Sequence, residues 1–108
     1  MRLCIIAGCV SDLDARTMPG AVTYRVDDLT AGLAELRAER CDCIVTPETI
    51  GEAASVSCLD VARVARGYGV SCVIVTEHDC DGPHGAVCML PGGNLAQAVE
   101  RAMVARGR

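Results

Sequence analysis

Five short apolar runs, separated by segments of helical periodicity, constrain the fold of this chain more than any other feature. The runs occupy residues 3–7, 21–26, 41–46, 70–76 and 86–90. Short apolar runs bounded by turn residues are typical of buried strands. Strands that alternate with helices pair in parallel through right-handed crossovers, with helices on both faces of the sheet. The sequence therefore predicts an α/β fold built on a five-stranded parallel sheet.

The first helical segment follows the second run. Leu29, Leu33 and Leu36 recur at i, i+4 and i+7, which places them on a single apolar stripe. Asp27 or Asp28 precedes the stripe, and either side chain can accept hydrogen bonds from the free N–H groups of the first turn. We expect a helix that begins directly after these aspartates.

Two further helices are expected, over residues 54–66 and 95–105. In the first of them, Leu59, Ala62 and Val61 or Ala65 are expected to face inward. The segment Pro91-Gly92-Gly93-Asn94 predicts a turn with Asn94 as the cap of the last helix. Its backbone N–H groups offer an alternative use as a phosphate cradle, although the spacing matches no Walker or dinucleotide fingerprint.

Length and composition indicate how many domains the protein has and which kinds of partner are disfavoured. The 108 residues correspond to one domain, residues 1–108, and about half of them are apolar. The net charge is −4, and Phe and Trp are absent, which disfavours nucleic-acid binding because phosphate contacts and stacking platforms are both lacking. The arginines of the helices are therefore expected on solvated faces rather than in an anion site: Arg63, Arg66, Arg101 and Arg106.

Neither a membrane nor a secretory role is indicated. No apolar run approaches the roughly 18 residues that a membrane span needs. The first residues enter a strand directly, without the charged, apolar and small-residue regions of a secretory signal. A cytoplasmic protein is expected.

Eight cysteines are many for this length. Cys4, Cys43, Cys72 and Cys88 lie inside apolar runs, which predicts free thiols packed as small hydrophobic side chains, since reducing compartments rarely keep disulfides. Cys41 and Cys43 are a possible redox pair. Alternation along a strand puts both on one buried face, however, where thiols are inert, so core packing is the favoured interpretation.

The loop over residues 77–84 concentrates histidine, cysteine and carboxylate side chains. His78, Cys80 and His84, with Cys9 from the end of the first strand, have the donor atoms that zinc prefers. The paired ligands of known zinc motifs are missing, which favours a solvated polar loop. A nucleophilic Cys9 assisted by His78 or His84 is a further alternative.

The order of these elements resembles that of response-regulator receiver domains. The likeness covers roughly residues 20–105 and is carried by residues 26–36, 42–46 and 73–76 and by Leu90-Pro91 ahead of the closing helix. It implies a flavodoxin-like three-layer sandwich with the five strands in the order 2-1-3-4-5. It also implies a role in two-component signalling.

The chain departs from the receiver pattern at the residues that carry its chemistry. Residues 7–9 are Ala, Gly and Cys where receivers place a magnesium-binding acidic pair. Pro47 occupies the phosphoacceptor position and Leu90 the position of the lysine, while Thr76 matches the hydroxyl residue of the family. Phosphoryl transfer needs a nucleophile, a metal and neutralising charge. We therefore expect neither phosphorylation, nor a cofactor, nor enzymatic activity.

The resemblance also implies that the first and fourth helices are shortened, because residues 8–21 and 76–86 leave little room for them. Missing helices would leave apolar sheet surface uncovered, and such patches usually mark contact sites. The expected function is phosphorylation-independent signalling through a protein partner, by a homodimer. The alternative is a small metal-binding or thiol-dependent protein that uses Cys9, His78, Cys80 and His84.

Overall fold

A computed structural model describes residues 2–6, 20, 22–47, 58–77 and 82–106 of the chain. Five parallel strands form one sheet in the order β2-β1-β3-β4-β5. Their bounds are β1 Arg2–Ile6, β2 Val22–Val26, β3 Cys43–Pro47, β4 Ser71–Val75 and β5 Val87–Met89. The fold is therefore the flavodoxin-like α/β arrangement that the sequence predicts.

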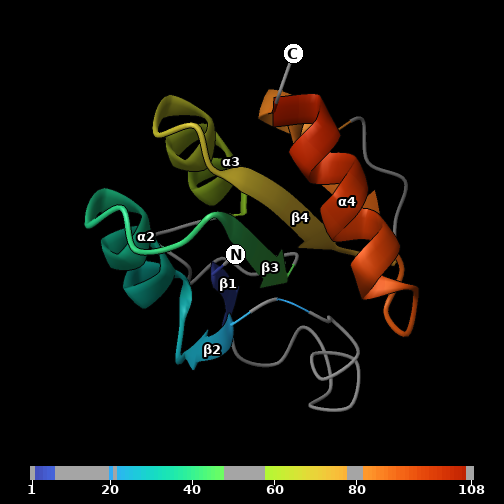
Figure 1. Cartoon of the computed structure of the whole chain (residues 1–108), viewed down its shortest axis with the longest axis horizontal. Coiled ribbons are helices and arrows are strands. Elements are labelled where there is room, and N and C mark those ends of the chain that lie inside the picture. The colour runs from blue at the N-terminus through green and yellow to red at the C-terminus, as the bar shows by residue number, and fades with distance from the viewer. Residues whose placement is uncertain (1, 7–19, 21, 48–57, 78–81, 107–108) are drawn as a thin grey trace.

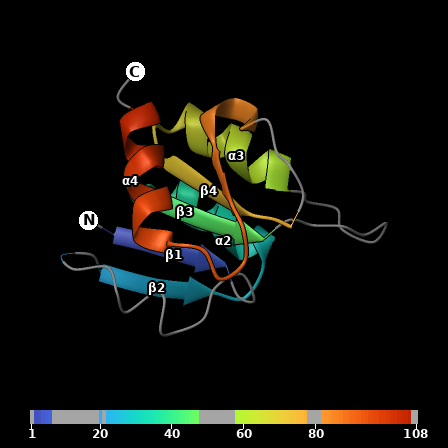
Figure 2. The same cartoon turned by 90° about the vertical axis from the view of Figure 1, so that its right-hand side faces the viewer.

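Helices cover both faces of this sheet. Their bounds are α2 Leu29–Arg37, α3 Cys58–Gly67 and α4 Leu95–Arg106, and a single 3-10 turn, η1 Pro83–Gly85, joins β4 to β5 within the described residues. α2 and α3 lie on one face and α4 on the other, which gives three layers (Figures 1 and 2). None of the described helices has the length and apolar character needed to cross a membrane.

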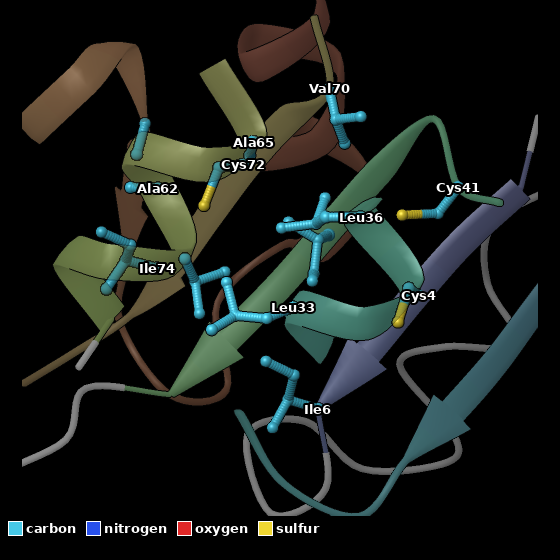
Figure 3. Close-up of a cluster of buried hydrophobic side chains, with 13 residues drawn as sticks. Cys4, Ile6, Leu33, Leu36, Cys41, Ala62, Ala65, Val70, Cys72 and Ile74 are labelled. Atoms are coloured by element: carbon cyan, nitrogen blue, oxygen red, sulfur yellow. The ribbon is translucent and has the colours of Figure 1, made fainter. Parts of the chain in front are cut away.

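Alternation along the central strands divides the core into two clusters. Ile44 of β3 faces α2 and α3, in the cluster that Figure 3 draws. Its neighbours Cys43 and Val45 face α4. Leu3 and Ile5 of β1 are also fully buried on the α4 side. The expectation of an uncovered apolar sheet face is therefore wrong for β1, β3 and β4, whose core-facing side chains are buried on both faces.

The predicted helix caps are confirmed. The N–H of Ala31 donates to Asp28 Oδ1 at 2.8 Å, so Asp28 rather than Asp27 caps α2. The N–H of Gln97 donates to Asn94 Oδ1 at 3.1 Å. Asn94 therefore caps α4, and the segment before it is a turn that starts the helix.

Two details of the predicted faces are wrong. Leu59 is 51% exposed, because the inward stripe of α3 runs through Val61, Ala62 and Ala65 and Leu59 lies off it. Cys41 lies before the first residue of β3, so strand alternation does not apply to it. Cys41 and Cys43 consequently pack in different clusters, on opposite faces of the sheet.

A bend at Asp42 separates these two cysteines. The N–H of Asp42 donates to the Arg2 carbonyl at 2.8 Å, and the Asp42 carboxylate accepts from the N–H of Arg2 at 2.8 Å. These two bonds tie the bend to the first residue of β1, and β3 begins only after it.

Candidate functional site

The carboxyl ends of the parallel strands meet at one edge of the sheet, where α/β proteins of this kind place their functional groups. β3 ends at Pro47, which lies in register with Val75, the last residue of β4. Proline has no backbone N–H to donate and no nucleophilic side chain. Pro47 itself therefore offers no group that can accept a phosphoryl group.

The two threonines at this edge, Thr46 and Thr76, are buried. Thr46 is fully buried, and its hydroxyl donates to the carbonyl of Pro47 at 3.2 Å. Thr76 is 5% exposed, and its backbone N–H donates to the carbonyl of Met89 at 2.9 Å, which extends the pairing of β4 with β5. Thr76 thus follows Val75, the register partner of Pro47.

The described charged residues that follow the strands at this edge are exposed, and they include Glu77, directly after Thr76. Leu90, the residue that follows β5, is 63% exposed and carries no charge. Asp27 and Asp28, which follow β2, are exposed, and Asp28 is engaged as a helix cap. Within the described ranges, no group of three or more His, Cys, Asp or Glu side chains is placed to hold a metal ion. The described part of this edge therefore supplies no cluster of metal ligands, and its carboxylates follow β2 and β4 rather than β3.

The structure places His84 away from the carboxyl edge. His84 belongs to η1 and shares a cleft with Gly69 and Val70, which precede the first residue of β4. Thr76 follows the other end of the same strand. The remaining members of the predicted metal and thiol site, Cys9, His78 and Cys80, lie outside the described residues, so the structure does not test that prediction.

The packing prediction holds for three of the four strand cysteines. Cys4, Cys43 and Cys72 are buried free thiols. Burial raises the pKa of Cys72 to about 12, which keeps this thiol protonated and unreactive at neutral pH. Cys88 is a correction, because it is disulfide-bonded. It lies on edge strand β5, where its side chain is only partly buried.

A cluster of titratable side chains at the opposite end of the sheet was not predicted. Cys4 of β1 and Cys41 belong to the same core cluster beneath α2 (Figure 3). Their side chains share a hydrogen bond. Tyr24 of β2 joins them and donates its hydroxyl to Glu35 Oε2 at 3.3 Å. Arg40 lies 3.6 Å from Glu35 and forms an ion pair with it.

The shared hydrogen bond makes the two thiols of this cluster unequal. The bond with Cys41, together with burial, raises the pKa of Cys4. The same bond lowers the pKa of Cys41, against the opposing effect of burial. No sequence spacing signals this contact, because the two cysteines come from separate elements.

Comparison with protein-family models, with curated proteins and with solved structures finds no match to this chain.

Proposed function

We propose that this chain is a pseudo-receiver, a signalling domain that acts through contacts with a protein partner and without aspartyl phosphorylation. One observation carries the proposal. Pro47 ends the central strand in register with Val75, within a sheet whose strand order is the order of receiver domains. A receiver-type fold thus carries a residue that cannot be phosphorylated at the position of the phosphoacceptor.

The surroundings of Pro47 support the same function. Transfer of a phosphoryl group needs oxygen ligands for Mg²⁺ and a cation to neutralise the developing charge. Leu90 stands at the cation position and is 63% exposed, and residues 7–9 contain no acidic residue. Loss of the nucleophile, the cation and the acidic pair together favours a scaffold that is used for binding rather than a reversible phosphorylation switch.

Incubation of the full chain with acetyl phosphate and Mg²⁺, followed by intact-mass measurement, tests the central claim. We expect an unchanged mass, since β3 ends in Pro47 rather than in a carboxylate. A stable adduct of about 80 Da, the mass of one phosphoryl group replacing a proton, overturns the proposal.

Pro47→Asp is the matched variant for this experiment. It restores the nucleophile alone and leaves Leu90 in place, so we expect it to remain unmodified as well. Labelling of Pro47→Asp, but not of the natural chain, would show that Pro47 is the only barrier to phosphorylation, which contradicts the claim that several losses act together.

A further inference from the structure

We draw no further inference here: the strongest candidate, the side-chain cluster of Cys4 and Cys41 beneath α2, carries nothing beyond packing, because both thiols are buried in the core, where thiols are inert, and the described residues add no third side chain that could hold a metal ion with them.

Discussion

Two buried hydroxyl groups at opposite ends of the sheet differ in whether they form a hydrogen bond, and we expect them to differ in their effect on stability. Thr46 and Ser71 are both at most 2% exposed. The Thr46 hydroxyl donates to the Pro47 carbonyl at 3.2 Å, while Ser71 Oγ is without a partner. The same chemical change, removal of the hydroxyl, should therefore have opposite effects at the two positions.

We expect Ser71→Ala to raise the free energy of unfolding by about 1 kcal/mol, because it removes the penalty of a desolvated hydroxyl. Thr46→Val keeps the shape of the side chain but deletes a satisfied bond, and should lower that free energy by about 1 kcal/mol. Urea denaturation of both variants measures the difference. A destabilised Ser71→Ala variant would indicate that Ser71 Oγ has a partner in solution.

The residues of the site also differ in whether their positions could be predicted from the sequence. Pro47 could be placed from sequence alone, because its position at a strand end depends only on the run before it. The contact between Cys4 and Cys41 could not, since the bend at Asp42 turns Cys41 onto the face opposite Cys43. Cys88 was misjudged because a disulfide depends on which side chain lies opposite, which local pattern does not specify.

At the scale of the element, α2 depends on a glycine for its close approach to the sheet. Gly32 is buried, and a Cβ placed there would lie 2.8 Å from Ile6 Cδ1 and 3.3 Å from Ile44 Cδ1. Both isoleucines are at most 1% exposed, so neither side chain moves without disturbing the core. The helix can therefore pack on β1 and β3 only if it has no side chain at this position.

We expect Gly32→Ala to destabilise the protein by about 1 kcal/mol, because overpacking of the core outweighs the better helix propensity of alanine. Ile6→Val removes the Cδ1 atom that meets the new methyl group, so Gly32→Ala should be less harmful, or stabilising, in that background. Thermal or urea unfolding of the natural chain, the two single variants and the double variant measures the coupling free energy between positions 6 and 32.

Gly67 provides the control for this cycle. A Cβ at Gly67, the last residue of α3, meets no atom within 4 Å. Gly67→Ala should be neutral or stabilising by up to about 1 kcal/mol, the helix-propensity difference between the two residues. Equal destabilisation by Gly32→Ala and Gly67→Ala would show that the contact with Ile6 is not the cause.

At the scale of the whole molecule, the proposed function requires association. The large apolar side chains that remain exposed are spread over different elements rather than gathered on one: Val22, Leu59, Tyr68, Leu90 and Val104. The sheet also has two edge strands, β2 and β5, whose outer edges are open to pairing within the described residues. The fold thus offers several routes to a second chain.

We expect light scattering to give a mass of twice 11.3 kDa, that of a homodimer. Leu59→Glu and Leu90→Glu place a charge on α3 and after β5, respectively, and the variant that lowers the mass identifies the contacting element. A monomer mass at every concentration would contradict the homodimer, but not the binding of a different protein partner.

The amino-acid sequence by itself determined the α/β class, the order of the elements, the capping residues Asp28 and Asn94, and the absence of a nucleophile at Pro47. These features follow from local periodicity and from the identity of single residues at element ends, so they need no knowledge of the neighbouring elements.

Only the tertiary structure decided which side chains meet. In the structure Cys41 forms a hydrogen bond with Cys4, and His84 lies at the other end of β4 from Thr76. Arg66, Ser71 and His84 line the same cleft. These residues come from elements far apart in the chain. Their contacts depend on where β5 stops pairing with β4, on how η1 crosses α3, and on how the bend at Asp42 is held. None of these features produces a periodic pattern in the sequence from which it could be predicted.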